Sequence, residues 1–495
     1  MNKTPRKHER NRESTKTNAY FFVSSKISCL RGNPFTETPK KIDLKEWSRQ
    51  FQKLDTDFIN QFYYYKNNDW GRYLFPPATF MVYGARQLKH LKFDNSLASL
   101  RLWGFSFNES ERLFRAKQSN RKVIATMGDL GTVPIIVMAF PGCIPFYPDC
   151  TWWTPFFNES NVLLDRASEM GVPEASCFVR SALAAFDKKA YFPKPDLLFA
   201  STGASCDDYS CIMQMVENFG HNITWLEMPY RRHSAKYLVS DKYQTTNQGL
   251  EYPERFEDYL VTEYKKVWDK MAELTGINDI ELLEQSIKKT NRLRRLIEKI
   301  KKLTYQAEIA PFPALEMMVI EFGNLYGYAD IDEWLDICET VYETIQERVK
   351  KGIGVLKPDA IPIAWVMPTA NPILLNLVED LGGRVVATEY VINQALVEIE
   401  QNIEPFRALA RSFLNASLIG STEERVRRIK EKVEQGKVKG VIITNMLGAS
   451  HCAMETKLIE QMLKDVPVLS IDVPAPLGIT EQLKTRLSAF METLK

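Results

Sequence analysis

Short apolar runs that alternate with helical segments limit the folds open to this chain more than any other feature. Seven runs have the length and the Gly, Pro or Asn boundaries of buried strands. They span 122–128, 196–202, 223–229, 361–368, 383–390, 440–446 and 466–474. Amphipathic helical stretches separate many of them. Strands that alternate with helices predict parallel sheets of the doubly wound type, so the expected fold class is α/β.

One strand–helix–strand unit occurs twice in the sequence. "PDLLFASTGASCDDYSCIMQMVENFGHNITWLEMP" (195–229) matches "KGVIITNMLGASHCAMETKLIEQMLKDVPVLSIDVP" (439–474) in the order strand, Gly-Ala-Ser, cysteine, helix, strand and proline. The repeat favours two similar Rossmann-like domains that face one another. The alternative is that unrelated βαβ units simply look alike.

The chain of 495 residues is too long for one ordinary core and is expected to divide into four parts. They are a helical, aromatic-rich N-terminal region (1–120), a first α/β domain (121–252), a helical connector (253–355) and a second α/β domain (356–495). Residues 41–66 predict an amphipathic helix. The aromatic side chains of this region, which include Trp47, Phe51, Phe58 and Phe62, form either a subunit interface or a cover for the first α/β domain.

Composition and hydropathy exclude several classes of partner and location. A formal net charge of +2 gives no reason to expect nucleic acid. No segment offers the roughly 18 consecutive apolar residues that a membrane helix requires. The basic first segment, residues 1–16, lacks the apolar run of a secretory signal, so a cytoplasmic location is expected.

Placement makes three of the eight cysteines candidate ligands. Cys206 and Cys452 each follow a strand and a glycine and lie where a helix begins, which is where open parallel sheets bind ligands. Backbone N–H groups there favour an anion and lower the pKa of a thiol, and a thiolate-held iron–sulfur cluster is such an anion. Cys177, in "GVPEASCFVRSALAAF" (171–186), is the third candidate. The alternative is that buried cysteines only pack.

The same segments resemble the 2-hydroxyacyl-CoA dehydratase / benzoyl-CoA reductase family, with a subunit similar to the 2-hydroxyglutaryl-CoA dehydratase D-component. The resemblance covers about residues 120–495. It rests on the segment around Cys177, the first repeat unit with Pro229-Tyr230, a connecting helix with Asn291 and Arg294, and a C-terminal signature that includes Gln482, Thr485, Arg486 and Phe490.

The resemblance implies two similar α/β domains with a [4Fe-4S] cluster between them, held by Cys177, Cys206 and Cys452. Three thiolates would leave one iron open to substrate oxygen, as in catalytic zinc sites. The resemblance further implies an acyl-CoA thioester substrate, a related partner subunit and a separate ATP-hydrolysing activator that supplies electrons. One low-potential electron on the thioester carbonyl gives a ketyl radical anion, from which hydroxyl leaves. The chain has no G-x-x-x-x-G-K motif, which fits ATP use elsewhere.

Some features depart from the family pattern or leave alternatives open. Ile135 and Ile136 follow Pro134 where family members commonly carry a glutamate. Cys143, Cys150 and Cys211 either pack inertly or support an enlarged cluster, and His451 either tunes the cluster or fills its loop. The basic "YRRHSAKY" (230–237) either binds CoA phosphates or forms a solvated loop.

Three other functions stay open at this point. The chain could be a benzoyl-CoA reductase-type core subunit, which the long N-terminus and "WLEMPY" favour slightly. It could be a double-cubane reductase, which the additional cysteines would serve. It could also be a non-catalytic partner subunit whose cluster relays electrons or stabilises a heterodimer.

The placement of the cysteines predicts which of them hold iron. Cys206→Ala or Cys452→Ala should each abolish stable cluster incorporation, because each removes one of three thiolate ligands. Cys29→Ala and Cys338→Ala, at cysteines isolated from the rest, should leave the iron content unchanged. Iron and sulfide analysis of anaerobically purified protein measures both effects. Full cluster occupancy in the Cys452→Ala variant would contradict the three-cysteine assignment.

Overall fold

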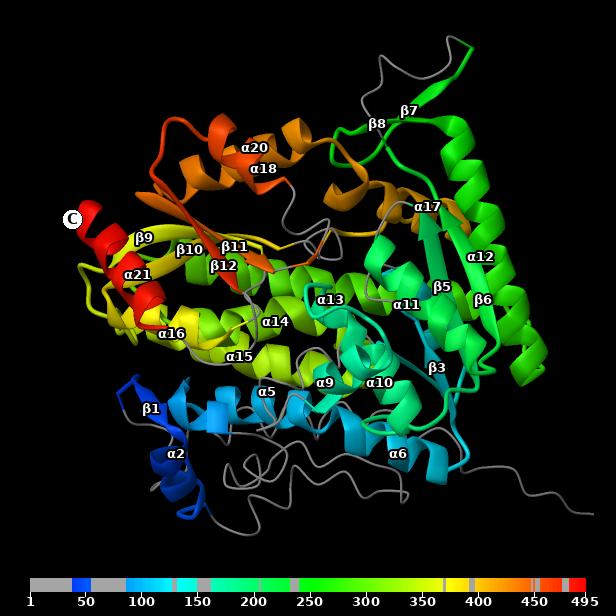
Figure 1. The fold of residues 1–495 in the computed structure, drawn as a ribbon, viewed down its shortest axis with the longest axis horizontal. Helices are drawn as coiled ribbons and strands as arrows, with labels where there is room; N and C mark the ends of the chain where they lie inside the picture. The colour runs from blue at the N-terminus through cyan, green and yellow to red at the C-terminus, as the bar shows by residue number, and fades with distance from the viewer. Residues whose placement is uncertain are drawn as a thin grey trace, which may run out of the picture.

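Two parallel sheets, with long helices running across both, form the main body of the molecule (Figure 1). The computed structural model describes residues 38–54, 86–126, 131–148, 162–203, 206–231, 240–367, 371–390, 397–446, 448–449, 455–473 and 480–495. Within this part of the chain, no helix is long and apolar enough to cross a membrane.

The first sheet has four parallel strands in the order β4-β3-β5-β6. These strands are β3 (Lys122–Ala125), β4 (Cys143–Phe146), β5 (Leu197–Gly203) and β6 (Ile223–Met228). The runs predicted at 122–128, 196–202 and 223–229 are thereby confirmed. β4 was not predicted, because it is short and contains Pro145. Proline cannot donate to a strand ladder and is tolerated here because β4 is an edge strand.

The second sheet repeats this topology with strands from the C-terminal part of the chain. Its order is β10-β9-β11-β12, again parallel throughout. The strands are β9 (Ile361–Val366), β10 (Gly383–Glu389), β11 (Gly440–Met446) and β12 (Val468–Val473), which confirms the remaining four predicted runs. In both sheets the second strand lies at the edge beside the first, and the third and fourth follow on the other side. The α/β class with two similar parallel sheets, expected from the repeat, is confirmed.

Helices connect the strands of the two sheets in matching order. α7 (Val133–Ala139) and α16 (Ile373–Asp380) join first to second strands, and α11 (Asp207–Asn218) and α20 (Thr456–Met462) join third to fourth. The longer crossover from second to third strand consists of α9 (Val162–Glu169), η4 (Phe178–Arg180) and α10 (Ser181–Lys188) in the first unit, and of α17 (Pro405–Leu414), η8 (Ser417–Ile419) and α18 (Thr422–Gln435) in the second. A short helical turn therefore lies midway along both crossovers.

Four helices in the stretch predicted to be a connector form a layer that contacts elements of both α/β units (Figure 1). They are α12 (Glu254–Thr275), α13 (Glu281–Gln306), α14 (Ala314–Tyr326) and α15 (Ile331–Lys351), with the turn η6 (Gly327–Asp330) before α15. The hydroxyl of Ser286, near the start of α13, donates to the carbonyl of Ile135 in α7 (2.6 Å). Near its end, Arg384 of β10 donates to the carbonyl of Thr304 (3.1 Å). The helices therefore brace the two sheets against each other.

The Asn-x-x-Arg pair of α13 holds the chain segment that follows β10. The Oδ1 atom of Asn291 accepts from the N–H of Ile399 and its Nδ2 donates to the carbonyl of the same residue, both at 2.8 Å. Arg294 donates to the carbonyl of Val397 and to the hydroxyl of Ser412 (3.2 Å). Both side chains are almost fully buried. This part of the family signature therefore has a structural role.

The C-terminal signature packs the last helix, α21 (Glu481–Thr493), onto the second sheet. Arg486 donates to the carbonyl of Ser470 in β12 (2.8 Å). Phe490 and Leu494 cover Gly440 at the start of β11, where an added Cβ would lie 2.9 Å from the ring of Phe490 and 2.6 Å from the side chain of Leu494. Gly440 is therefore needed for close packing of α21.

The described part of the N-terminal region combines helices with a small antiparallel strand pair. It contains β1 (Lys41–Asp43), α2 (Leu44–Phe51), η2 (Arg86–His90), β2 (Lys92–Asp94), α5 (Leu97–Phe107) and α6 (Glu109–Gln118), with β1 paired to β2. A second antiparallel pair, β7 (Tyr243–Thr245) and β8 (Glu251–Pro253), precedes α12. Of the helix predicted at 41–66, residues 44–51 are helical. Phe58 and Phe62 lie outside the described residues.

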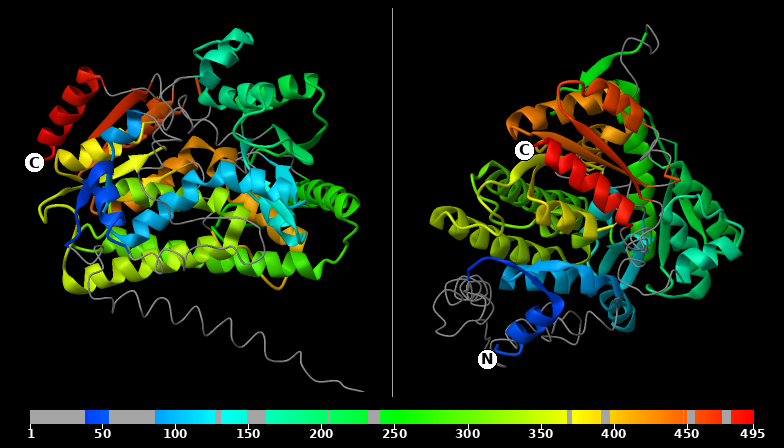
Figure 2. Two further views of the ribbon diagram at one scale, coloured as in Figure 1. Left: turned by 90° about the horizontal axis from the view of Figure 1, so that it is seen from below. Right: turned by 60° about the vertical axis from the view of Figure 1, so that its left-hand side comes forward.

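The N-terminal region is anchored to late elements of the chain by ion pairs. Arg348 of α15 donates to both carboxylate oxygens of Asp94 (2.6 and 3.1 Å). Lys41 of β1 lies 2.9 Å from Glu379 of α16, and Figure 2 shows β1, in dark blue, beside α16, in yellow. The region therefore covers the α14–α16 side of the molecule as well as the first sheet, and it could not be placed there from sequence. The four predicted domain boundaries remain predictions.

Trp47 and Phe51, the described aromatic side chains of the predicted N-terminal helix, belong to the core. Trp47 is fully buried and stacks on Phe93 with ring centroids 4.7 Å apart. Phe93 in turn meets the edge of Trp103 at 5.3 Å. For these residues the interface hypothesis is wrong, because both are buried, and in the described part of the chain α2 packs on β1 and β2 of the same N-terminal region and not on the first α/β domain.

Replacing Trp47 with alanine should lower the free energy of unfolding by about 3–5 kcal/mol, because a large side chain leaves a cavity in a packed aromatic cluster. Arg49→Ala on the same helix is the control. Its side chain is 58% exposed and, among the described residues, forms an ion pair with Glu46 alone, so its cost should stay within about 0.5 kcal/mol. Urea or thermal unfolding measures both. Equal effects of the two substitutions would contradict the core assignment.

Candidate functional site

The carboxyl ends of the third strands are where the sequence predicts ligand binding, and the sheet orders support this position. In each sheet the first and third strands are neighbours, β3 beside β5 and β9 beside β11. The connection after the first strand runs toward one edge of the sheet, and the connection after the third strand runs toward the other edge. This divergence opens a crevice at the carboxyl ends of the two strands. Cys206 lies three residues after the end of β5, and the loop that contains Cys452 follows β11. Cys452 and His451 themselves lie outside the described residues.

Cys206 caps the N-terminus of α11 and is half-buried. The hydroxyl of Ser210, one helical turn later, lies 2.7 Å from the carbonyl oxygen of Ser201 and 3.2 Å from that of Cys206. Ser210 therefore fixes the turn between the end of β5 and the start of α11, and with it the position of the cysteine.

Cys177 caps the short turn η4 and is only 5% exposed. Burial raises the pKa of its thiol to about 11, although the backbone N–H groups of Val179 and Phe178 hydrogen-bond to the sulfur and oppose the shift. The charge of Asp208, in the first turn of α11, raises the pKa further. η4 and α11 are in contact, so the structure brings Cys177 and Cys206 onto neighbouring elements. Binding of a metal would displace the proton from Cys177.

Gly448, four residues before Cys452, lies directly against the chain that leads to Cys177. A Cβ atom on Gly448 would lie 1.8 Å from the carbonyl oxygen of Ala175 and 2.7 Å from the carbonyl carbon of Ser176. Gly448 also has a positive φ of +79°, which glycine adopts readily. Four residues of extended chain span at most about 14 Å, and Cys452 follows Gly448 by four residues in the sequence. The distance between its sulfur and those of Cys177 and Cys206 remains to be tested against the roughly 7 Å expected for ligands of one cluster.

A buried cation lies beside Cys177. Arg180 is 5% exposed, donates to the carbonyl of Ser176 and has its Cζ atom 6.0 Å from the ring centroid of Phe178. Its Nε atom is buried and has no hydrogen-bond partner among the described residues. Burial lowers the pKa of Arg180, and Cys177 opposes that shift more than Glu174 or Asp165 does. A positive charge and an unused donor beside two cysteines fit an anionic ligand at this position.

The other described cysteines lie on β4, on the exposed side of α11 and in α15. Cys143 begins β4 at the amino end of the first sheet, and burial raises its pKa to about 11. Cys211 is exposed on α11, and Cys338 is fully buried in α15. These positions favour cysteines without a part in a cluster. Cys29 and Cys150 fall outside the described part of the chain, and none of the described cysteines is in a disulfide.

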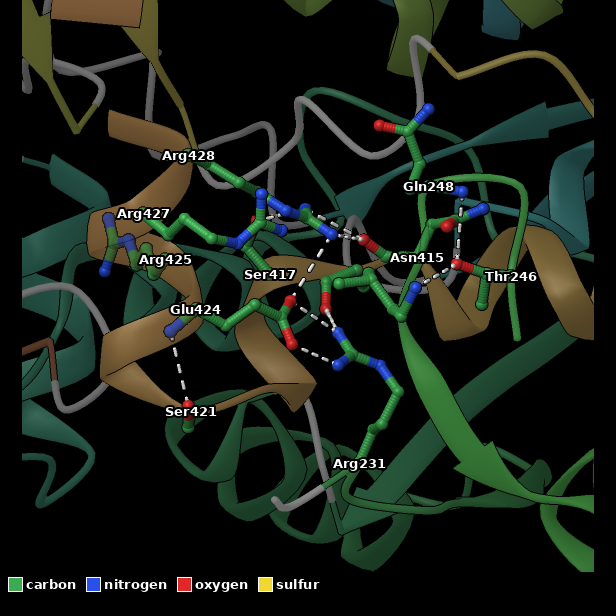
Figure 3. A network of polar contacts seen from close by, with 12 residues as sticks. Arg231, Thr246, Gln248, Asn415, Ser417, Ser421, Glu424, Arg425, Arg427 and Arg428 are labelled. Atoms are coloured by element: carbon green, nitrogen blue, oxygen red, sulfur yellow. Dashed lines mark hydrogen bonds and ion pairs between the residues drawn. The ribbon is translucent and has the colours of Figure 1, made fainter. Parts of the chain in front are cut away.

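Arg231, the first described arginine of the basic segment 230–237, takes part in a buried network instead of facing solvent (Figure 3). Its guanidinium donates to both carboxylate oxygens of Glu424 and to the carbonyls of Leu414 (2.7 Å) and Ala416 (3.2 Å). Its backbone N–H donates to the carbonyl of Ile419 (2.6 Å). Arg231 therefore links the chain after β6 to η8. This structural role differs from both roles expected for the segment, binding of CoA phosphates and a solvated loop. Residues 232–239 lie outside the description.

A second buried arginine fixes the far end of the loop that contains Cys452. Arg425 of α18 donates to both oxygens of Glu389, at the end of β10 (3.1 and 2.8 Å), and to Glu455, directly before α20 (2.9 Å). Gly448 and Glu455 are thus held on either side of the cysteine. Neither Arg180 nor Arg425 was identified from the sequence. The only available signal was the spacing of Arg180 from Cys177, one helical turn.

Ile135 and Ile136, which replace the polar residue common in the family, are fully buried in α7. They extend the hydrophobic core of the first unit and leave no polar group at this point. The departure noted in the sequence is therefore a substitution within the core.

Comparison with protein families gives a match to the model of the 2-hydroxyglutaryl-CoA dehydratase D-component over residues 132–494. The chain belongs to this family. The resemblance inferred from the sequence is confirmed, and the chain is a subunit of a 2-hydroxyacyl-CoA dehydratase-type enzyme. The match includes the second sheet, strands β4, β5 and β6 of the first sheet, and Cys177, Cys206 and Cys452, whereas the N-terminal region and β3 precede it. No individual curated protein matches the chain.

The contact at Gly448 leads to a prediction for this dehydratase subunit. Gly448→Ala should reduce iron incorporation strongly, because the methyl group forces the Cys452 loop away from Ala175. Gly142→Ala is a matched control, since Gly142 also has a positive φ (+81°) but nothing lies within 4 Å of an added Cβ. Both variants should lose about 1 kcal/mol or more of stability from backbone strain. Only Gly448→Ala should lose iron, measured per chain after anaerobic reconstitution. Retention of full iron by Gly448→Ala would argue against a site built at this contact.

Proposed function

We propose that the chain is the iron–sulfur subunit of an activator-dependent 2-hydroxyacyl-CoA dehydratase, with Cys177, Cys206 and Cys452 as ligands of a [4Fe-4S] cluster. The observation that carries the proposal is the backbone contact of Gly448 with Ala175 and Ser176. It sets the loop of Cys452 against the segment of Cys177, which itself adjoins α11 and Cys206. Family membership supports the reaction class.

The arrangement of the two units supports three cysteine ligands and an open iron. Cys206 and Cys452 both follow third strands, so the two units contribute one thiol each at this position. In the longer crossovers, the residue that caps the short helical turn is Cys177 in the first unit but Ala416 in the second. The second unit therefore has no thiol to match Cys177. Three thiolates leave one iron for a substrate oxygen, as an open coordination position does in catalytic zinc sites.

A bound cluster would supply one low-potential electron to the thioester carbonyl of the acyl-CoA, and the resulting ketyl radical anion would expel the hydroxyl group as hydroxide. Loss of a proton from the adjacent carbon would complete the loss of water, which consumes no electron overall, so the electron would then be returned. The chain's own part is to hold the ligands still and keep water out. Ser210 and Arg425 fix the two cysteine loops, and Cys177 lies in an environment that is almost fully buried.

Partners follow from the same proposal. The family is named for one component of a dehydratase, which supports a related partner subunit in a heterodimer. Electrons would come from a separate ATP-hydrolysing activator, since this chain carries no phosphate-binding loop motif. The substrate would be an acyl-CoA thioester.

A non-catalytic subunit that relays electrons or stabilises the heterodimer is the second candidate. A double-cubane reductase is less favoured, because Cys143 lies at the start of the edge strand β4 and Cys211 is exposed on α11. Benzoyl-CoA reductase-type chemistry would use the same three cysteines, so the choice between the two reactions rests on the substrate.

Anaerobic purification followed by iron and sulfide analysis tests the proposal. About four iron and four sulfide per chain are expected, the content of one [4Fe-4S] cluster. A 2-hydroxyacyl-CoA should then change the EPR signal of the reduced protein, because substrate oxygen reaches the open iron. An aryl-CoA that changes the signal while 2-hydroxyacyl-CoA does not would favour ring reduction. A cluster indifferent to both would favour the relay, and protein without iron would refute the proposal.

A further inference from the structure

Arg180 is the buried charge that the proposed site leaves unexplained. It lies three residues after Cys177, and its guanidinium is held by the carbonyl of Ser176 and the ring of Phe178. The Nε donor is buried without a partner among the described residues, and the side chain forms no ion pair with a carboxylate of the described chain. A buried guanidinium in this state is costly unless a counter-charge is present.

Other buried arginines of the chain show what such a residue normally requires. Four of them face a carboxylate: Arg101 faces Glu333, Arg231 faces Glu424, Arg348 faces Asp94 and Arg425 faces Glu389. The pairing satisfies the charge where water is excluded. The buried Arg294 instead donates to the carbonyl of Val397 and the hydroxyl of Ser412. By comparison, Arg180 forms no ion pair with a carboxylate of the described residues, and Cys177 influences its charge more than Glu174 or Asp165 does.

We propose that Arg180 interacts with the [4Fe-4S] cluster as a positioning residue that donates a hydrogen bond and a positive charge, and so raises the cluster's reduction potential. This inference rests on the proposed function, since the cluster is the missing anion. The reduced cluster carries one more negative charge than the oxidised one. A cation and a donor nearby stabilise the reduced form more, and hydrogen bonds and net charge are two of the factors that set such potentials.

Asp208 provides a charge of opposite sign at the same place. It lies in the first turn of α11, two residues after Cys206, is half-buried, and its charge acts on the thiol of Cys177. A negative charge at this position destabilises the reduced cluster, which is the more negative form, whereas the positive charge of Arg180 stabilises it. The potential is therefore set by two opposed charges, one from each cysteine segment of the first unit. Their removal should shift the potential in opposite directions.

The experiment is an EPR-monitored redox titration of the full-length, anaerobically reconstituted protein and its Arg180→Gln, Arg180→Lys and Asp208→Asn variants. Arg180→Gln should lower the ratio of reduced to oxidised cluster at a fixed potential by about ten-fold, which is 59 mV for a one-electron couple. Arg180→Lys, which keeps the charge but loses the fork of donors, should shift the potential the same way by less. Asp208→Asn should raise the ratio. Arg292→Gln, at a surface arginine whose side chain is 62% exposed, is the control and should leave the potential unchanged.

The outcomes separate this inference from the proposed function. A wild-type chain without iron would refute the proposed function and leave no cluster for Arg180 to act on. A wild-type cluster together with an unchanged potential in Arg180→Gln would overturn the inference alone. If Arg180→Gln fails to retain iron, Arg180→Lys decides: a lowered potential supports the inference and an unchanged potential overturns it. A shift of the same sign in Asp208→Asn and Arg180→Gln would also overturn it.

Discussion

The constraint on which the proposed site depends is the contact between the backbone of Gly448 and the backbone of Ala175 and Ser176. A Cβ at Gly448 would lie 1.8 Å from a carbonyl oxygen, so any side chain would push the two segments apart. The segments belong to different α/β units and lie more than 270 residues apart in sequence (448 − 175 = 273). One glycine therefore determines how closely the loops of two cysteines can approach.

Buried ion pairs hold the elements around that contact in place. Arg231 joins the chain after β6 to η8, Arg425 joins β10 to the start of α20, and Arg348 joins α15 to the N-terminal strand pair. Removal of one partner from a buried pair typically costs about 3–5 kcal/mol, because the other charge stays buried and unpaired. These pairs therefore specify which distant segments meet. Their value lies in the geometry they enforce more than in net stability.

The two units share a topology, but their candidate ligands are not symmetric. Both have a cysteine after the third strand, whereas only the first has one in its long crossover, where the second has Ala416. The charges nearest the first unit's cysteines, Arg180 and Asp208, also belong to that unit. Under the proposed function, the first unit would supply two ligands and tune the cluster. The second unit would supply one ligand, so that one iron of the cluster has no cysteine ligand.

The sequence by itself determined the strands, the repeat, the family and the cysteines at the ends of β5 and β11, because strand runs, turn residues and helix starts are local patterns. It did not indicate β4, whose Pro145 is tolerated only at a sheet edge. It could not place the N-terminal region on α15 and α16, give Arg231 a structural role, or identify Arg180 as a buried charge. Each of these depends on which remote groups are near and on how far water is excluded. Tertiary structure alone decides both, since the energy of a charge depends on its neighbours and surroundings far more than on its residue type.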